Sequence, residues 1–201
     1  TFFQAPGRMN VFNEHPFKVL FDYGHNAHAV SVMADLAQRL DVAGRRIVVV
    51  AGPGDRRNED LVDIANAVAG RFDHYICRRD DDLRGRDGDE VPKLIAATLR
   101  NRGVRDDQIT LIPNEQEAID AALRMGEAGD LLLVFADALV RSWKQVIKFR
   151  PEGAPARTSL AEVMSAAPVA QPVVEEPTAA GSWEGLVRDE RGVRLAREDA
   201  D

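Results

Sequence analysis

Most side chains in this sequence that could take part in chemistry lie in four polar segments, each placed after a short apolar run. The first segment, Asp22–Asn26, combines a carboxylate with tyrosine and histidine, and residues 52–57 combine glycine with arginine. Residues 78–90 mix carboxylates and guanidinium groups around two glycines, and the fourth segment contains Asp137 and Ser142. Because a carboxylate can accept two parallel hydrogen bonds from one guanidinium group, the third segment suits a cationic or zwitterionic ligand.

The apolar runs themselves predict strands that are buried on both faces, because they are continuous rather than alternating. Helical patterns lie between them, and Asn114 with Glu117 predicts a capping box for one helix. This alternation predicts an α/β fold: a Rossmann-like, doubly wound, mostly parallel sheet with helices on both faces. Ligands bind outside the carboxyl ends of such strands, so the four polar segments should face one crevice. The runs are Val19–Phe21, Ile47–Val50, Tyr75–Cys77, Ile109–Ile112 and Leu131–Phe135.

The two flanks of the sequence differ from this regular middle. Residues 8–18 predict an edge hairpin that leads into the first buried strand. Residues 150–181 are rich in proline, alanine and glutamate without a long apolar period, which is typical of a linker or a loosely packed arm. Residues 183–197 regain Trp, Leu and Val around a Glu-Arg-Gly turn, which predicts a short hairpin.

The first polar segment also has simpler interpretations. Asp22, His25 and Asn26 could only cap the following helix, because aspartate and asparagine do so routinely. Asp22 could instead join His25 and His28 in a metal cluster, although this spacing matches no specific metal site. The sequence leaves these interpretations open.

The second and third segments have alternatives of their own. Residues 52–54 resemble the start of a dinucleotide fingerprint, and Arg78 and Arg79 follow at the distance where an NADP enzyme keeps an arginine for the 2′-phosphate. Against this, Arg57 replaces the third glycine, and the motif follows the second strand rather than the first. Residues 78–90 could also be only a solvated charged loop.

Composition excludes several classes of function. The 201 residues are 45% hydrophobic and 29% charged, and a net charge of −7 gives no reason to expect a nucleic-acid or anionic-membrane partner. No apolar run approaches the roughly 20 residues that span a bilayer, and the first residues lack the pattern of a signal peptide, so a cytoplasmic protein is expected. Cys77 is the single cysteine and is expected to be a buried strand residue.

The sequence lacks the motifs of a complete catalyst. It contains no Gly-Lys pair and therefore no Walker A phosphate-binding loop, and it has no Gly-x-Ser-x-Gly nucleophile elbow. We therefore expect the chain to act as part of a larger enzyme and to be inactive alone.

Two motifs resemble those of the Mur ligase family. Residues 5–10, Ala-Pro-Gly-Arg-Met-Asn, are similar to the segment that ends the central ATPase domain of the family. Residues 22–26 are similar to the D-x-x-H-N motif that opens its Rossmann-like C-terminal domain, which folylpolyglutamate synthetases share. Ala27 stands where many relatives have proline, a departure expected to alter a turn rather than the chemistry. Within the family, residues 55–60, 84–86 and 188–196 most resemble the ligases that attach arginine to poly-aspartate, and the resemblance runs from Phe3 to about Ala196.

The resemblance implies the C-terminal lid domain of an ATP-dependent, amide-bond-forming ligase. In such ligases ATP phosphorylates a side-chain carboxylate of poly-aspartate, and the amine of arginine attacks the acyl phosphate. The implied cofactors are ATP and Mg²⁺, with the Mg²⁺ ligands in the central domain and no metal site in this chain. The implied partners are arginine, the poly-aspartate chain, the upstream domains of the same polypeptide and further copies of the protein in a homo-oligomer.

The resemblance also implies nucleotide-binding roles. Arg8 would stabilise charge on the phosphates during phosphoryl transfer. Asp22 would accept hydrogen bonds from both ribose hydroxyls, and Tyr23, His25 and Asn26 would lie on or near the adenine.

The substrate arginine would bind at the loop after the third strand. Carboxylates there would bind its guanidinium, and Arg84 or Arg86 would bind its carboxylate. The candidate carboxylates are Asp80, Asp81, Asp82, Asp89 and Glu90, and the end of the last strand adds Asp137 and Ser142.

These expectations divide the chain into four parts. Residues 1–16 are expected to be a hinge segment and edge strand from the central domain, and residues 17–150 the C-terminal Rossmann-like domain. Residues 151–181 are expected to be a linker or arm, and residues 182–201 a tail with a short hairpin. Two other functions stay open: a module that has lost catalysis and serves as a scaffold, and an NADP-binding oxidoreductase domain.

Overall fold

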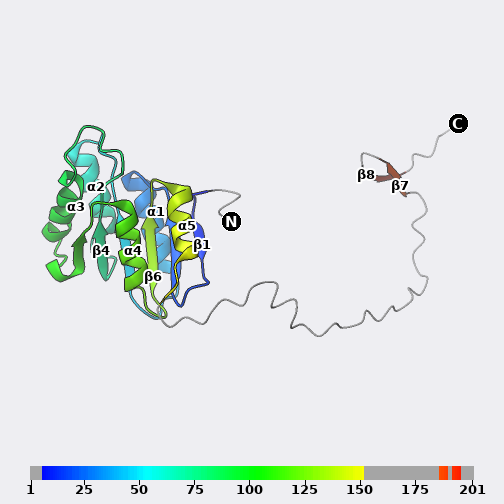
Figure 1. The fold of residues 1–201 in the computed structure, drawn as a ribbon, viewed down its shortest axis with the longest axis horizontal. Helices are drawn as coiled ribbons and strands as arrows, with labels where there is room; N and C mark the ends of the chain where they lie inside the picture. Colours follow the sequence, from blue (N-terminus) through cyan, green and yellow to red (C-terminus); the bar gives the residue numbers. More distant parts are fainter. Residues whose placement is uncertain (1–5, 152–185, 190–191, 196–201) are drawn as a thin grey trace. The chain divides into compact units, whose positions relative to one another are not determined.

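The structure, a computed structural model, describes residues 6–151 together with the strand residues 186–189 and 192–195. Within residues 6–151, an edge strand is followed by alternating strands and helices (Figure 1). The strands are β1 (Asn10–Phe12), β2 (Lys18–Asp22), β3 (Arg46–Val50), β4 (His74–Cys77), β5 (Ile109–Leu111) and β6 (Leu131–Phe135). The helices are α1 (Ala27–Arg39), α2 (Asn58–Val68), α3 (Glu90–Asn101), α4 (Glu115–Met125) and α5 (Leu139–Lys148), and a 3-10 turn at Asp106–Gln108 precedes β5.

The strands of residues 6–151 form one sheet in the order β1-β2-β6-β3-β4-β5. All neighbouring pairs are parallel except β1 and β2, which are antiparallel with Asn10 opposite Phe21. The predicted mostly parallel sheet and the predicted edge hairpin are therefore both confirmed. The strand that comes last in this sheet along the sequence, β6, pairs with both β2 and β3 and so lies inside it.

Helices cover both faces of the sheet, as predicted. Val48 and Val50 of β3 lie in the hydrophobic cluster that α1, α2 and α3 cover, and Ile47 and Val49 lie in the cluster under α4 and α5. Each of these four side chains is fully buried. Consecutive residues of β3 point to opposite faces of the sheet. Helices cover both faces, so the run is continuously apolar. The same double cover buries Cys77, which confirms its interpretation as a core residue, and this burial raises the pKa of its thiol to about 12.

The remaining described residues form a hairpin of two antiparallel strands, β7 (Leu186–Asp189) and β8 (Gly192–Leu195), which confirms the predicted short hairpin. The predicted linker or arm lies outside the described residues except for Pro151. Among the helices that the structure describes, none is long and apolar enough to cross a membrane.

A histidine joins the β1–β2 hairpin to the end of α5. The His15 ring packs against Phe12, Phe17 and Phe149, with centroid distances of 4.6, 5.1 and 5.6 Å, and its Nε2 lies 2.8 Å from the Val146 carbonyl oxygen. Burial lowers the pKa of His15, the hydrogen bond to Val146 partly opposes this, and the positive charge of Arg150 adds to the lowering. The folded state therefore favours the neutral ring.

We expect the free energy of unfolding to decrease as the pH falls below the pKa of a histidine in the unfolded chain, about 6.5. The unfolded state then binds a proton that the folded state resists until the pH reaches its lowered pKa. Urea unfolding between pH 7.5 and 5.5 measures this slope. His15→Gln should reduce the slope, whereas substitution of the exposed His28 should not. An unchanged slope in His15→Gln would contradict the assignment.

Candidate functional site

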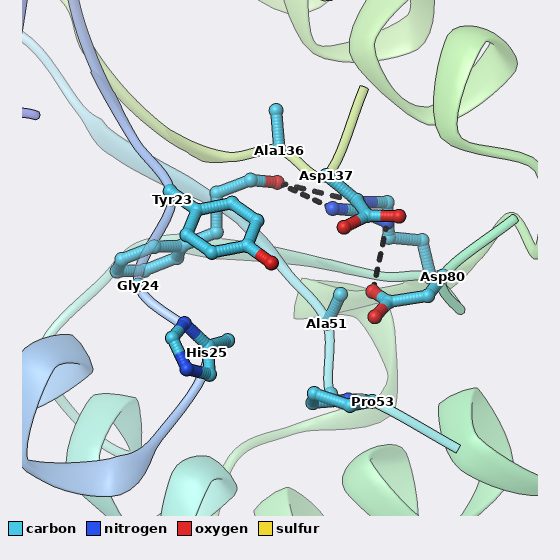
Figure 2. A pocket seen from close by; sticks show the side chains of 11 residues that line it. Tyr23, Gly24, His25, Ala51, Pro53, Asp80, Ala136 and Asp137 are labelled. Carbon is cyan, nitrogen blue, oxygen red and sulfur yellow. Dashed lines mark hydrogen bonds and ion pairs between the residues drawn. The ribbon is translucent and has the colours of Figure 1, made fainter. Parts of the chain in front are cut away.

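The segments after β2, β3, β4 and β6 surround one pocket at the carboxyl edge of the sheet, as the sequence predicted (Figure 2). Figure 2 shows Tyr23 and His25 on one side of this pocket and Asp80 and Asp137 on the other. The pocket therefore has an aromatic side and an acidic side. It is lined by Tyr23, Gly24, His25, Ala51, Gly52, Pro53, Arg78, Asp80, Phe135, Ala136 and Asp137.

Residues 7–10 form a tight turn that is fixed to the end of β2. The Gly7 N–H donates to Asn10 Oδ1 over 2.8 Å, and the Met9 N–H donates to Asp22 Oδ2 over 2.8 Å. The Tyr23 N–H donates to the Gly7 carbonyl oxygen, also over 2.8 Å. Gly7 and Met9 have φ angles of 69° and 47°, a region that non-glycine residues rarely adopt, so this turn needs the three hydrogen bonds to persist.

Asp22 is 6% exposed and serves two backbone groups. Besides Met9, its carboxylate accepts the Gly24 N–H over 2.7 Å, so one side chain holds both the 7–10 turn and the start of the β2–α1 segment. The N-cap of α1 is Asn26, whose Oδ1 accepts the Ala29 N–H over 2.9 Å. The capping interpretation is therefore confirmed for Asn26, whereas the described hydrogen bonds of Asp22 serve other groups.

Arg8 lies at the tip of the 7–10 turn, next to the aromatic side of the pocket. Its guanidinium carbon is 5.8 Å from the centre of the Tyr23 ring, and the Tyr23 and His25 rings are 4.9 Å apart. Within the described part of the chain, no carboxylate pairs with Arg8, and His25 Nδ1 is buried without a hydrogen-bond partner. Arg8, Tyr23 and His25 therefore form a cluster, with the two rings tilted by 49°, whose guanidinium donors are available to a ligand.

The loop after β4 folds back over the loop after β3 and is held there by Arg86. This guanidinium donates to the carbonyl oxygens of Gly54 and Arg56 over 2.8 and 2.5 Å and to Asn58 Oδ1 over 2.8 Å, and it also pairs with Glu90. A Cβ at position 54 would lie 2.2 Å from the Leu83 carbonyl oxygen, so the contact of the two loops requires glycine. Residues 78–90 are thus an anchored loop with an exposed outer side.

Most of the charged residues in this loop have partners within the chain. Arg84 pairs with Asp55 at 3.1 Å and also approaches Asp82, while Asp81 pairs with Arg141. Asp89 and Glu90 pair with Lys93 and Arg86. Of the acidic candidates, the structure places Asp80 and Asp137 in the pocket and the others outside its lining.

Asp80 and Asp137 differ from these residues in their surroundings. Asp80 is 7% exposed, its closest charged partner is Arg78 Nη1 at 3.6 Å, and no described N–H or O–H group donates to its carboxylate. Burial raises the pKa of Asp80, Arg78 lowers it, and the nearby Asp137 raises it again. The Asp137 carboxylate likewise has no hydrogen-bond donor among the described residues. Two carboxylates thus face the pocket with vacant acceptor positions.

Two further candidates lie directly behind these carboxylates: Arg78, which the sequence suggested only for a dinucleotide phosphate, and Glu115, which sequence reasoning missed. Arg78 and Glu115 are 1% and 0% exposed and pair at 3.0 Å. Ser142, a predicted substrate-binding residue, is fully buried and donates to Glu115 Oε1 over 2.5 Å. The Arg78 of the dinucleotide interpretation is therefore enclosed in the protein rather than presented to a phosphate.

The side chains present suit a nucleotide. Asp22 retains acceptor capacity beyond its two backbone bonds, since a carboxylate has about four lone-pair sites. The Tyr23 and His25 rings suit a base, and Arg8 suits phosphates. Among the described residues, no group of three or more His, Cys, Asp or Glu side chains could hold a metal ion. The metal interpretation of Asp22, His25 and His28 therefore has no support here.

Comparison with known proteins agrees with this geometry. The family model described as Mur ligase, glutamate ligase domain, matches residues 7–138. A cyanophycin synthetase of Geminocystis herdmanii is 36% identical over 148 residues, which are 73% of this chain and 16% of that protein. A UDP-N-acetylmuramyl-tripeptide synthetase of Treponema denticola is 25% identical over 130 residues, which are 64% of this chain and 24% of that protein. The alignment with the cyanophycin synthetase covers 148 residues. It is therefore shorter than the resemblance expected from the motifs, which ran from Phe3 to about Ala196.

Solved structures share the fold. A UDP-N-acetylmuramoyl-L-alanyl-D-glutamate–2,6-diaminopimelate ligase matches with a TM-score of 0.56 at 21% identity, over 71% of this chain and 32% of that chain. E. coli FolC in complex with DHPP and ADP matches with a TM-score of 0.55 at 23% identity, over 71% of this chain and 31% of that chain. The family model covers well over half of the sequence, and the fold agrees with it. The chain therefore belongs to the Mur ligase family, whose glutamate ligase domain its residues 7–138 match.

Proposed function

We propose that this chain is the C-terminal lid domain of a ligase that uses ATP to join arginine to aspartate side-chain carboxylates of a poly-aspartate chain. Membership of the Mur ligase family supports an ATP-dependent ligase, and the similarity to cyanophycin synthetase supports arginine and poly-aspartate as substrates. The upstream domains of the same polypeptide would supply the phosphate-binding loop and the Mg²⁺ ligands.

The observation that carries the proposal is the acidic side of the pocket. The buried guanidinium of Arg78 lies 3.0 Å from Glu115 and 3.6 Å from Asp80, and a third carboxylate, that of Asp137, lines the same pocket. Two further guanidinium groups lie nearby: Arg141 pairs with Asp81 and lies 3.8 Å from Glu115, and Arg79 donates to the Asp80 carbonyl oxygen. With Asp81 included, four carboxylates face three guanidinium groups, which leaves a net negative charge. The excess negative charge suits a cationic ligand, and a planar guanidinium can engage two carboxylates through its several N–H donors.

The remaining roles follow from the placement of each side chain. When bound, ATP supplies the phosphoryl group that activates the acceptor carboxylate. Asp22 would accept the ribose hydroxyls, and Tyr23, His25 and Asn26 would lie near the adenine. Arg8 would donate to phosphate oxygens from the tip of the 7–10 turn.

The sequence offered either Arg84 or Arg86 to bind the carboxylate of the substrate arginine. The contacts of the two side chains support one of them. The guanidinium of Arg86 is occupied by the carbonyl oxygens that anchor its loop. Arg84 has a third of its side chain exposed. We therefore propose Arg84 rather than Arg86 for this contact.

The test is substrate-dependent phosphate release by the complete ligase. With poly-aspartate as acceptor, arginine should stimulate phosphate release from ATP and become incorporated into the polymer. Lysine should be at least roughly tenfold less effective, because a compact ammonium cannot match two carboxylates as a guanidinium does. This chain alone should release no phosphate. Phosphate release that is equal with and without arginine would contradict the proposal, and a complete protein that releases no phosphate would favour a scaffold role.

A further inference from the structure

The ion pair between Arg78 and Glu115 lies directly behind the acidic side of the pocket. Both side chains are almost completely enclosed, and their closest atoms are 3.0 Å apart. A buried ion pair is weak evidence for stability, because removing two charges from water costs about as much as their attraction returns. The groups that this pair holds in place are therefore the more informative feature.

Glu115 fixes the segment between β6 and α5, although it belongs to α4. Its carboxylate accepts the backbone N–H groups of Asp137 and Ala138 over 2.8 and 3.1 Å and the hydroxyl of Ser142 over 2.5 Å. The backbone of Asp137 therefore cannot move away without leaving a buried charge short of donors.

Arg78 fixes the other side of the same pocket. Its guanidinium donates to the Phe135 carbonyl oxygen over 2.8 Å and to the Arg79 carbonyl oxygen over 2.7 Å. Its Nη1 also lies 3.6 Å from Asp80 Oδ1, so it places a positive charge behind that carboxylate. The ends of β4 and β6 are thus joined through one side chain.

We propose that the Arg78–Glu115 pair sets the separation of the Asp80 and Asp137 carboxylates and so determines which cation they accept. Glu115 is then a positioning residue for substrate selection, acting through Asp137, and Arg78 performs the same task for Asp80. This inference rests on the function proposed above, since it assumes that the two aspartates hold the substrate cation.

The experiment compares Glu115→Gln with Glu117→Gln in the complete ligase. Glu117 is exposed on the first turn of the same helix and serves as the matched control. Glu115→Gln should raise the KM for arginine by roughly 10- to 100-fold, the size of effect that a small displacement of a binding group produces. The KM for ATP should change less than about twofold. Equal changes in both KM values, or an unchanged KM for arginine in the folded enzyme, would overturn the inference.

Two further variants keep the test decisive. If Glu115→Gln fails to fold, Arg78→Lys keeps the buried positive charge but lacks the planar fork that reaches both carbonyl oxygens. It should raise the KM for arginine selectively, and an unchanged KM would count against the pair. In Glu115→Gln with Asp137→Asn, the KM for arginine should be no higher than in Asp137→Asn alone, because the first residue acts through the second. If the two substitutions raise the KM for arginine additively, Glu115 does not act through Asp137.

The aspartate variants separate this inference from the proposed function. If Asp80→Asn and Asp137→Asn raise the KM for arginine but Glu115→Gln and Arg78→Lys do not, the site stands and the positioning role is wrong. If neither aspartate variant changes that KM, the proposed arginine site itself is wrong, and the positioning role falls with it.

Discussion

If the proposed function is correct, replacing Asp80 or Asp137 by asparagine should raise the KM for arginine of the complete ligase by roughly 30-fold or more. Leaving a desolvated guanidinium without its carboxylate costs about 2–5 kcal/mol, and both carboxylates face the pocket without a donor from the described residues. Steady-state titrations of arginine and ATP measure the effect, and the KM for ATP should stay nearly constant.

The matched control is Asp87→Asn, because Asp87 is exposed in the same loop. Neutralising a surface charge there should cost well under 1 kcal/mol. The pH gives a second readout: as the pH falls through the raised pKa of Asp80, its carboxylate becomes protonated and arginine should bind more weakly. In Asp80→Asn this pH dependence should be lost. Arginine kinetics that are unaffected by both substitutions would place the substrate elsewhere.

Replacing Asp22 by alanine should impair both the fold and the use of ATP. Two N–H groups, those of Met9 and Gly24, would lose a charged acceptor at a site that is 6% exposed. Each buried donor left unsatisfied costs about 1–3 kcal/mol, so the free energy of unfolding should fall by roughly 2–6 kcal/mol. ATP affinity should fall by at least about tenfold, because the ribose acceptor and the clamp on the turn that carries Arg8 disappear together.

Two variants separate these contributions. Asp22→Asn keeps one acceptor oxygen, which can serve only one of the two N–H groups, and should recover part of the stability but little of the ATP affinity. Arg8→Ala leaves every hydrogen bond of the 7–10 turn in place and should lower kcat while the melting temperature stays close to that of the wild type. An Asp22→Ala enzyme with a lowered melting temperature and normal ATP affinity would show that Asp22 has only a structural role.

The fold was predictable because its strands are buried on both faces. The run Ile47–Val50 differs from β3 by one residue, and the cap that Asn114 provides for α4 is also confirmed. The course of the 78–90 loop was not predictable. It depends on Arg86 reaching the carbonyl oxygens of Gly54 and Arg56, 30 or more residues earlier in the chain.

The candidate site was predictable only as a region. In sequence, Asp80, Asp81 and Asp82 are equivalent carboxylates, and only the fold buries the first and leaves the other two exposed. Glu115 did leave a signal that sequence reasoning missed. It shares a helix face with the apolar residues Ala118 and Ile119, three and four positions later, and a carboxylate on an apolar stripe requires a buried partner.

The place of β6 in the sheet has a consequence for how the chain folds during synthesis. β2 and β3 emerge from the ribosome long before Leu131–Phe135, the strand that must lie between them. Until then, two apolar strands have an unpaired edge, and closing the sheet requires contacts across more than 80 residues. Truncated or stalled chains that end before β6 should therefore be prone to aggregation and to capture by chaperones.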